Sequence, residues 1–464
     1  MHPTLALSKK LRELTPQEGQ ELYEKLKALA LDNGLWSEVN GAPVPLKIAA
    51  APWFVTARQT EYLTEVAWAV RQSLKRLTKL WFQRPEARAL LPLAPLEEQF
   101  FNLFGDPTGL PDERLFCRLD ALCRFDGEDW TDSLQFLENN VVGIGGMTYA
   151  PAATLLVERL FELLSISHDN FSYLPDPRKL LAEELFQHAV ARGLRGEITV
   201  ALLDDQNQYR LGGEMGRLAK FFQSVGIRAL AIDARDLVLD SQGELRAGDN
   251  KVDLIYRFVE LRELLETPDC LHALRPLWTA FQRGLVVPSL AGDLDHKSTF
   301  ELLTSDDFAS HFRPEWLEIL KKHVPWTRLL YERHTTSPLG EKVDLFDYAE
   351  NNRDRLVLKP NRDCGGCKVL LGSKASGTEW RAALEEAAQR PRGFVIQQSI
   401  DLVEEELPCL SESGEVEWSN RYLSLGLFPT NRQTGALGRF SDGAVVNISQ
   451  NGGVVPLIVL EEDN

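Results

Sequence analysis

Hydrophobic positions along the first hundred residues recur at intervals of three and four, which is the spacing of one face of an α-helix. The pattern is clearest over 14–36 and again over 57–83. Thr15, Pro16 and Glu18 form a helix-start signal, with a capping residue, a first-turn proline and a capping-box glutamate. We therefore predict a mainly helical N-terminal region over residues 1–111.

The pattern changes to alternation after residue 112. Apolar side chains at Leu115, Cys117 and Leu119 predict a strand within 114–127, and a second strand is predicted within 133–146. A helix is expected at about 150–165. Residues 112–195 therefore form one predicted α/β segment.

Residues 197–259 alternate between continuous apolar runs and an amphipathic stretch. The predicted order is a buried strand at 197–205, a helix at 214–226 and strands at 227–237 and 252–259. This order favours a parallel, Rossmann-like unit over 196–284, with a further helix at about 262–283. The first strand lacks the glycine fingerprint of dinucleotide-binding proteins.

The last region, 285–464, mixes strands with helices in an α+β pattern. The fold class is therefore α/β and α+β with several lobes, and we expect antiparallel sheets with flanking helices in this region. Helices are predicted at 297–310, 313–322 and 376–389. Strands are predicted at 355–360, 368–372, 393–400, 417–428 and 443–450.

Charge and composition narrow the range of partners. The 464 residues carry a formal net charge of −17, which disfavours nucleic acid and anionic membranes as partners. No apolar run is long enough to span a bilayer, and the charged N-terminus argues against a signal peptide. We expect a cytoplasmic protein that acts on small molecules. The six cysteines do not suggest a disulfide framework.

The segment around Lys359 is the strongest chemical signal. A strand carries this lysine, and Gly365, Gly366 and Lys368 follow in a short turn. Glycines let backbone N–H groups approach an anion, and lysine adds positive charge, so the segment resembles a phosphate clamp. A plain surface hairpin is the alternative. Cys364 and Cys367 belong to the same turn, and we interpret them as incidental thiols, not as a redox or zinc site.

Two further groups of polar residues are candidates for a site. Lys297, which follows Asp295 at a predicted helix start, is either a second phosphate-binding lysine or part of a helix cap. Arg118 and Asp120 share one strand face, and Glu138 and Asn139 end the next strand before a glycine-rich turn. The four side chains suit a zwitterionic substrate or, alternatively, a surface ion-pair network: Arg118, Asp120, Glu138 and Asn139.

The last two predicted strands carry another polar group. Glu417, Ser419 and Arg421 share a face by two-residue spacing, as Asn447 and Ser449 do on the following strand. We place Arg439 in the connection between the two strands. These oxygen donors and guanidinium groups suit Mg²⁺ and a phosphorylated intermediate, and a solvated sheet face is the alternative.

Taken in order, these motifs resemble the circularly permuted ATP-grasp family, which includes proteins similar to glutathionylspermidine synthase. The likeness covers about 112–464. It departs from the family pattern at His296, at Gln398 and at Ser419, where the family has an aspartate expected to bind the metal. The motifs that carry it are Arg118-Leu-Asp120, Leu137-Glu-Asn-Asn140, Asp253-Leu-Ile-Tyr256-Arg257, Asp295-His296-Lys297, Lys359-Pro360 through Gly366, Gln397-Gln398, Ser419-Asn420-Arg421 and Val445 through Gly453.

The resemblance implies an ADP-forming carboxylate–amine ligase that uses ATP and Mg²⁺ and forms an amide bond through an acyl phosphate. It makes 112–195 the substrate side, 196–284 the unit before the ATP-grasp and 285–464 the nucleotide-binding region. A catalytically degenerate nucleotide-binding or scaffold protein is the alternative. The implied roles are ATP binding by Lys297, Lys359, Gly365, Gly366, Lys368, Gln397 and Gln398, metal binding by Asn447 and Glu417, catalysis by Arg421, Arg257 and Arg439, and substrate binding by Arg118, Asp120, Glu138 and Asn139.

Overall fold

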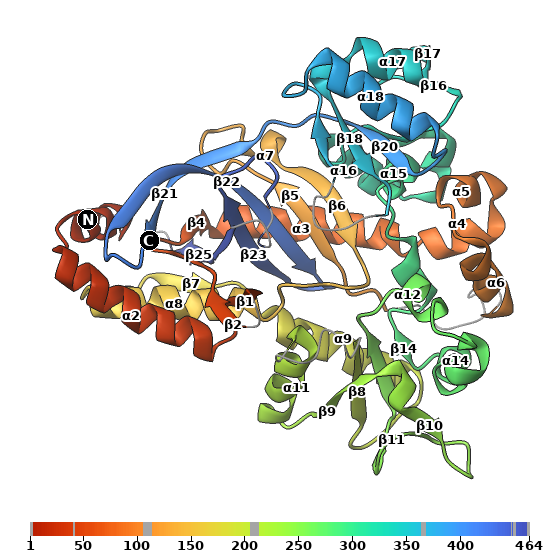
Figure 1. The fold of residues 1–464 in the computed structure, drawn as a ribbon, viewed down its shortest axis with the longest axis horizontal. Coiled ribbons are helices and arrows are strands. Elements are labelled where there is room, and N and C mark those ends of the chain that lie inside the picture. Colours follow the sequence, from red (N-terminus) through yellow and green to blue (C-terminus); the bar gives the residue numbers. More distant parts are fainter. Residues whose placement is uncertain are drawn as a thin grey trace.

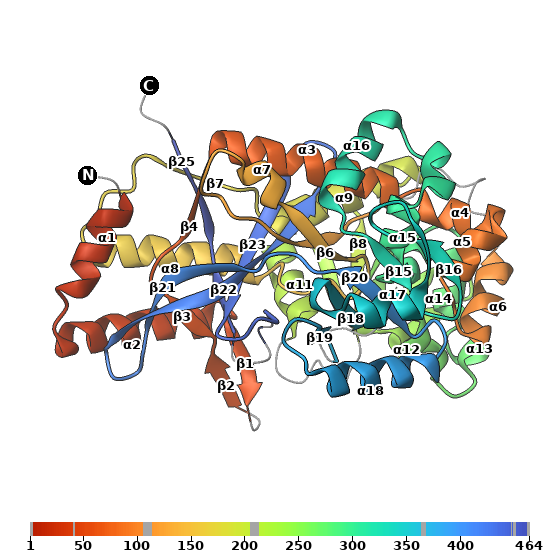
Figure 2. The ribbon, with the colours of Figure 1, turned by 90° about the horizontal axis from the view of Figure 1, so that it is seen from above.

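A central sheet with helices on both faces joins two smaller lobes, one above and one below it in Figure 1. The computed structural model describes residues 3–39, 42–104, 114–204, 213–362, 368–446, 448 and 452–461. Seen from above, α3 runs along the upper edge of the central body and α8 lies in its left part (Figure 2).

The N-terminal region is mainly helical in its described part, as predicted. Thr15 caps its second helix by accepting from the backbone N–H of Glu18, and the Glu18 side chain accepts from the backbone of Thr15. The predicted 57–83 helix is interrupted at 75–76. The elements are α1 (Pro3–Arg12), α2 (Pro16–Asp32), α3 (Ala57–Leu74), α4 (Leu77–Gln83), α5 (Pro85–Leu90), α6 (Pro95–Phe104), and the short strands β1 (Trp36–Val39), β2 (Ala42–Pro45), β3 (Lys47–Ala49) and β4 (Trp53–Thr56).

The central sheet is assembled from three distant parts of the chain. Its strand order is β21-β3-β24-β23-β22-β5-β6, and an additional pairing of β21 with β22 closes five of these strands into a ring. The predicted regions 1–111, 112–195 and 285–464 therefore share one sheet. The strands after β3 are β5 (Arg118–Leu122), β6 (Gln135–Asn140), β21 (Val403–Leu410), β22 (Val416–Pro429), β23 (Thr434–Ser441) and β24 (Gly453–Val455).

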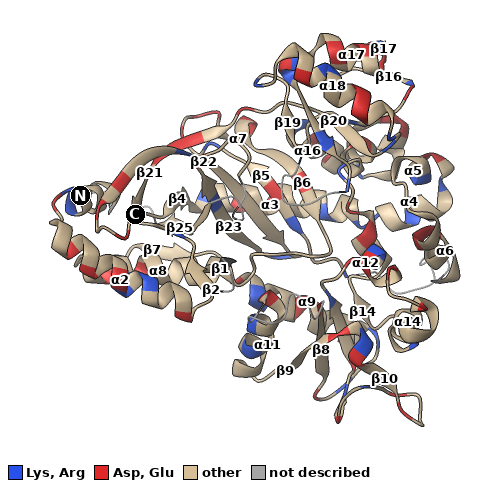
Figure 3. Ribbon diagram, in the orientation of Figure 1, with Lys and Arg blue, Asp and Glu red and all other residues tan. Residues whose placement is uncertain are grey.

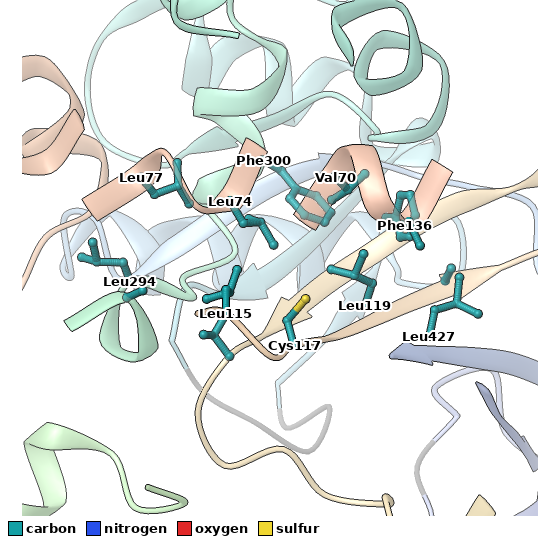
Figure 4. Close-up of a cluster of buried hydrophobic side chains, with 14 of the residues drawn as sticks. Val70, Leu74, Leu77, Leu115, Cys117, Leu119, Phe136, Leu294, Phe300 and Leu427 are labelled. Atoms are coloured by element: carbon teal, nitrogen blue, oxygen red, sulfur yellow. The ribbon is translucent and has the colours of Figure 1, made fainter. Parts of the chain in front are cut away.

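The main hydrophobic core lies between α3 and one face of this sheet. Figure 4 shows Val70 and Leu74 of α3 gathered with Leu119 of β5, Phe136 of β6 and Leu427 of β22 in one cluster. Because side chains alternate along a strand, Arg118 and Asp120 point to the face opposite Leu119. The other face packs against α8 (Tyr149–Leu163), where Leu156 and Leu160 are buried.

The lower lobe is the predicted Rossmann-like unit. Its four-stranded sheet has the order β14-β13-β8-β9, and every pairing in it is parallel. The predicted helix at 262–283 is instead three short helices. The elements of this part are β8 (Thr199–Asp204), α11 (Glu214–Ser224), β9 (Arg228–Asp233), β10 (Leu237–Leu239), β11 (Leu245–Ala247), β12 (Asn250–Lys251), β13 (Leu254–Arg257), α12 (Leu261–Leu265), α13 (Cys270–Ala273), α14 (Arg275–Gln282) and β14 (Val286–Val287).

The upper lobe holds the antiparallel sheet β15-β20-β18-β19, in agreement with the predicted α+β class. Leu356 and Leu358 of β18 pack under α17 and α18, so Val357 and Lys359 point to the opposite face, toward the central sheet. The elements are α15 (Thr299–Thr304), α16 (Pro314–His323), β15 (Thr327–Leu329), β16 (His334–Thr336), β17 (Lys342–Asp344), α17 (Leu345–Asn351), β18 (Leu356–Pro360), β19 (Leu370–Leu371), α18 (Gly377–Ala388) and β20 (Phe394–Gln398).

Two sequence predictions near the C-terminus are wrong. Arg439 lies inside β23, not in a connection, and residues 443–446 of the predicted 443–450 strand are irregular. The sequence of β23, TGALGRFS, contains two glycines and lacks a clean alternation, so its pattern does not predict a strand. The remaining elements are α7 (Trp130–Ser133), β7 (Phe171–Tyr173), α9 (Pro177–Ala191) and β25 (Leu457–Leu460).

Within the described ranges, every helix is too short or too polar to cross a bilayer. Charged residues of both signs are distributed over all the lobes, with acidic side chains concentrated along β21 (Figure 3).

Candidate functional site

A cavity of about 400 Å³ lies between the central sheet and the upper lobe. Strands β5, β6, β22 and β23 supply its wall on one side, and β18 and β20 supply the other. The glycine-rich turn after β6 and the N-terminal end of α11 complete it. Figure 1 shows the strands β5 and β6 beside β18 and β20, although these pairs are far apart in the sequence.

Asp120 is the most strongly paired carboxylate of the cavity. Arg118 binds it through Nε and Nη2 at 2.7 and 3.0 Å, and Arg439 approaches its Oδ2 to 3.0 Å. Burial alone raises the pKa of Asp120, but the two guanidinium groups outweigh burial and lower this pKa to about 2. The carboxylate is therefore ionised at neutral pH.

Two lysines approach the same cavity from the upper lobe and its neighbouring segment. Lys297 Nζ lies 3.0 Å from Glu138 Oε2, and Lys359 donates to Gln397 Oε1. Gln397 is oriented in turn because its amide donates to the Thr327 hydroxyl at 2.9 Å. Burial lowers the pKa of Lys359 to about 8, with Glu138 opposing and Lys297 reinforcing the shift. Because burial disfavours the charged form of this lysine, an anionic partner in the cavity would stabilise that form.

The lining of the cavity combines charged and apolar side chains. Its charged groups, which include Asp120, Glu138, Lys297 and Lys359, lie together with apolar side chains of both walls. Gly143, Gly145, Gly146, Tyr149 and Glu214 line it as well. The apolar residues include Leu122, Leu137, Val357, Val369, Leu371, Ile400 and Leu402.

The glycine-rich turn after β6 brings backbone to the cavity wall. Gly146 has a φ of +90°, and a Cβ there would lie 2.6 Å from Leu437, so a larger residue does not fit. Glu214 holds the turn from the lower lobe by accepting from Gly146 N at 2.8 Å and Thr148 N at 3.1 Å. The lower lobe therefore fixes one part of the cavity wall.

The structure does not place the predicted Asn139 of β6 in the cavity. Asn140, not Asn139, lines the cavity with Glu138, because residues two apart share a strand face. Asn139 points into the protein, where its Oδ1 accepts from the Thr299 hydroxyl at 2.6 Å. The Leu-Glu-Asn-Asn sequence permits both assignments.

Arg257 does not reach the cavity. Its side chain is fully buried in the lower lobe, where Nη2 lies 2.7 Å from Asp293 Oδ2. It also donates to the carbonyl oxygens of Val259 and Ser289. These contacts describe a structural ion pair that holds the end of β13, and they separate Arg257 from the predicted catalytic group.

Glu417 and Arg421 share a strand face, as the spacing predicts, but that face is the other one. The register of β22 is continuous from 416 to 429, so Arg421 alternates with Ser424, which lines the cavity. Arg421 lies 3.2 Å from Asp442, and 59% of the Glu417 side chain is exposed. Neither residue lines the cavity.

The other predicted residues lie away from the cavity or outside the described residues. Lys368 pairs with Glu386 on the surface at 3.0 Å. Gln398 follows Gln397 on β20 and faces a different surface groove. Three predicted site residues and the two cysteines of the glycine turn lie outside the described residues: Gly365, Gly366, Asn447, Cys364 and Cys367.

The cavity also contains residues that the sequence analysis does not select. Asn140, Tyr149, Glu214 and Ser424 all line it. Asn140 is detectable from its two-residue spacing to Glu138. Glu214 carries no such signal, because its partners in the turn are 66 and 68 positions away.

The oxygen atoms in the cavity suit a small divalent cation. Asp120 and Glu138 are cross-strand partners on β5 and β6, and Asn140 lies two residues beyond Glu138. Among the described residues, no three His, Cys, Asp or Glu side chains form a metal cluster. Mg²⁺ requires fewer protein ligands, because it keeps several waters and takes oxygens from bound phosphates. Two carboxylates and one amide therefore fit it.

The chain is similar to known proteins over nearly its whole length. No protein-family model matches it. An uncharacterized protein of Mycobacterium leprae is 24% identical over an alignment of 489 positions, gaps included, which covers 95% of this chain and 77% of that protein. A second, from Mycobacterium tuberculosis strain H37Rv, is also 24% identical, with 95% and 79% covered.

One solved structure is similar over nearly the full length. It is a glutathione synthetase-like effector from Globodera pallida in its apo form, with a TM-score of 0.67 and 16% identity. The alignment covers 96% of this chain and 98% of that one. The chain therefore shares its overall fold with a glutathione synthetase-like protein.

Proposed function

We propose that this protein is an ATP-dependent carboxylate–amine ligase with a circularly permuted ATP-grasp fold, and that the cavity binds ATP with Mg²⁺. The observation that carries the proposal is the meeting of Lys297 and Lys359 with Asp120 and Glu138 in one cavity. Cations suit phosphate oxygens, and carboxylates suit the metal that accompanies them. The shared fold with a glutathione synthetase-like protein agrees with this chemistry.

The nucleotide is assigned to the side of the cavity formed by the upper lobe. Val357, Leu371 and Ile400 offer an apolar surface for the base, and Lys359 follows Val357 on the same face of β18. Lys359 and Lys297 would then meet the phosphates. Gly365 and Gly366, which lie outside the described residues, keep their predicted role in ATP binding as a proposal.

The metal is assigned to the central sheet. Asp120, Glu138 and Asn140 would hold it, and Mg²⁺ there would neutralise phosphate charge and orient the transferred group. Arg118 and Arg439 hold the Asp120 carboxylate in place. This assignment replaces Glu417, which projects from the opposite face of β22.

The remaining part of the cavity is assigned to the acid and the amine. In the first step the substrate carboxylate oxygen attacks the γ-phosphorus of ATP, forming an acyl phosphate and releasing ADP. In the second the amine attacks the acyl carbon, the carbon–nitrogen bond forms, phosphate leaves and the nitrogen loses a proton. Arg439 lies beside Asp120 in the cavity wall, and its guanidinium would stabilise negative charge that develops on the reacting groups in both steps.

The experiment is a search for substrate-dependent ADP release. Purified protein is incubated with Mg²⁺ and ATP, and ADP is measured with paired amino acids, short peptides and amines. The Lys359→Ala variant serves as the control for a contaminating ATPase. ADP release that needs both an acid and an amine and is lost in this variant supports the ligase. Nucleotide binding without ADP release for any pair favours the degenerate binder.

A further inference from the structure

The segment 295–299 runs along the end of β6 and holds it at three successive points. Lys297 Nζ lies 3.0 Å from Glu138 Oε2, and the Thr299 hydroxyl donates to Asn139 Oδ1 at 2.6 Å. Asp295 Oδ2 accepts from Val141 N at 3.0 Å and Val142 N at 3.3 Å. Asn140 lies between these held residues and lines the cavity.

Asp295 has a specific task in this arrangement. Strand β6 ends at Asn140, so the next two N–H groups have left the β5–β6 ladder. Asp295 supplies an acceptor for both of them. A buried N–H without an acceptor is destabilising, so the carboxylate favours a single path for the chain immediately after Asn140.

The same segment is itself fixed to the upper lobe. Lys297 N donates to Asn361 O at 2.9 Å, and Ser298 N donates to Asn361 Oδ1 at 2.9 Å. Asn361 directly follows β18, the strand that carries Lys359. Asp295 therefore ties the end of β6 to the strand on the opposite side of the cavity.

We propose that Asp295 is a positioning residue that sets the geometry of the Glu138–Asn140 oxygen pair by holding the backbone after β6. It acts through hydrogen bonds to Val141 and Val142 and does not line the cavity. The inference rests on the proposed function, because it takes Glu138 and Asn140 as magnesium ligands. Residues that orient metal ligands typically affect metal affinity about 10–100-fold.

The test measures ATP binding by titration calorimetry over a series of Mg²⁺ concentrations, without any second substrate. In Asp295→Ala the Mg²⁺ concentration for half-maximal enhancement of ATP binding should rise about tenfold or more. ATP affinity without Mg²⁺ should stay unchanged, because Lys297 and Lys359 remain. In Asp295→Asn the amide oxygen can still accept both N–H groups, so the Mg²⁺ requirement should stay within about twofold of the parent.

Asp344→Ala is the matched control. Asp344 also accepts two backbone N–H groups, from Phe346 and Asp347, but it caps α17 away from the cavity. It should leave the Mg²⁺ requirement unchanged while lowering the unfolding temperature. If Asp295→Ala fails to fold, Asp295→Glu replaces it, since the longer side chain displaces the carboxylate, and the requirement should again rise.

Three results would overturn the positioning role of Asp295, and the first of them would also overturn the proposed function. A parent protein without Mg²⁺-dependent ATP binding removes the proposed function, and this inference with it. A parent that binds, together with an Asp295→Ala variant of unchanged Mg²⁺ requirement, removes this inference alone. A large rise in Asp295→Asn also overturns it, because charge and not hydrogen bonding would then be responsible.

Discussion

Asp120 and Glu138 are direct cross-strand partners on β5 and β6, so two carboxylates lie side by side in the wall of the cavity. Like charges placed opposite each other destabilise a sheet. Each carboxylate is offset by a cation from another element, Arg439 for Asp120 and Lys297 for Glu138. Because the repulsion between two neighbouring carboxylates does not stabilise the fold, a bound cationic ligand explains their presence better than the stability of the sheet does.

The first prediction concerns this pair. Glu138→Gln should abolish Mg²⁺-dependent turnover and leave the fold intact, because the change is nearly isosteric and removes only the charge that the cation needs. Glu417→Gln is the matched control. Its side chain is 59% exposed on the other face of β22, so ADP release and the Mg²⁺ requirement should match the parent. Equal loss in both variants would contradict the placement of the metal.

The second prediction separates the two neighbouring asparagines of β6. Asn140→Ala should raise the Mg²⁺ requirement of ATP binding by at least about tenfold, since it removes an oxygen ligand. Asn139→Ala should instead lower the free energy of unfolding by about 1 kcal/mol, because the buried hydrogen bond to the Thr299 hydroxyl is lost, although His296 O remains as an acceptor for that hydroxyl. Denaturant unfolding and calorimetry measure the two effects. An exchange of the two phenotypes would mean that the face of β6 is assigned wrongly.

These residues also show where sequence reasoning succeeds and where it stops. The two-residue spacing of Arg118 and Asp120 predicts a shared face, and the structure confirms it. The same rule for Glu417 and Arg421 predicts a shared face but not which one it is. Strand β22 is buried on both faces from Leu423 onward, so the hydropathy of its residues does not predict which face borders the cavity.

The fold is predictable where periodicity is local and is missed where it depends on distant partners. The sequence predicts the parallel unit, because its buried strands alternate with an amphipathic helix, and the structure contains it. The seven-stranded sheet is not predictable in this way. It joins β3 near residue 48 to β24 near residue 454, and nothing local encodes such a pairing. The contact between Glu214 and the glycine turn is invisible for the same reason.

The third prediction concerns nucleotide affinity. Lys359→Ala should weaken ATP binding by about 1.5–3 kcal/mol, the scale of a charge-assisted hydrogen bond. Lys342→Ala is the control, since Lys342 is an exposed lysine on β17 of the same lobe. Calorimetry gives both dissociation constants. An unchanged ATP affinity in a folded Lys359→Ala protein would exclude this lysine from the phosphate site.

The fourth prediction follows from the lowered pKa of the same lysine. In the free protein Lys359 has a pKa of about 8, so it is charged below pH 8 and largely neutral above it. Phosphate binding then requires it to take up a proton, and ATP affinity should fall as pH rises above 8, by up to about tenfold per pH unit. In Lys359→Arg the affinity should stay level between pH 8 and 10, because arginine does not titrate there.

The same lowered pKa has the opposite effect on folding: the free energy of unfolding should rise with pH, whereas ATP affinity should fall. In the unfolded chain this lysine has its ordinary pKa of 10.5, so between pH 8 and 10.5 the unfolded chain holds more protons at this site than the folded one. This site therefore makes the free protein more stable as pH rises through that window. Comparing the parent with Lys359→Met by denaturant unfolding isolates the contribution. A parent whose stability relative to Lys359→Met does not change from pH 8 to 10 would contradict the lowered pKa.

The last prediction concerns Arg257, which the family resemblance places among the catalytic residues. Its fully buried guanidinium pairs with Asp293 at 2.7 Å, so Arg257→Met leaves a buried carboxylate without its cation. Breaking such a pair costs about 3–5 kcal/mol, and denaturant unfolding should show a loss of that size. The double variant Arg257→Met/Asp293→Asn should recover part of it, because no unpaired charge remains. Lys321→Ala, which removes an exposed pair with Asp306, should change stability little. If the folded fraction of Arg257→Met keeps parental ATP affinity, the role of Arg257 is structural. If the protein is fully stable but loses ADP release, Arg257 acts on the reaction after all, and the lower lobe must bring it to the cavity in a conformation that differs from this one.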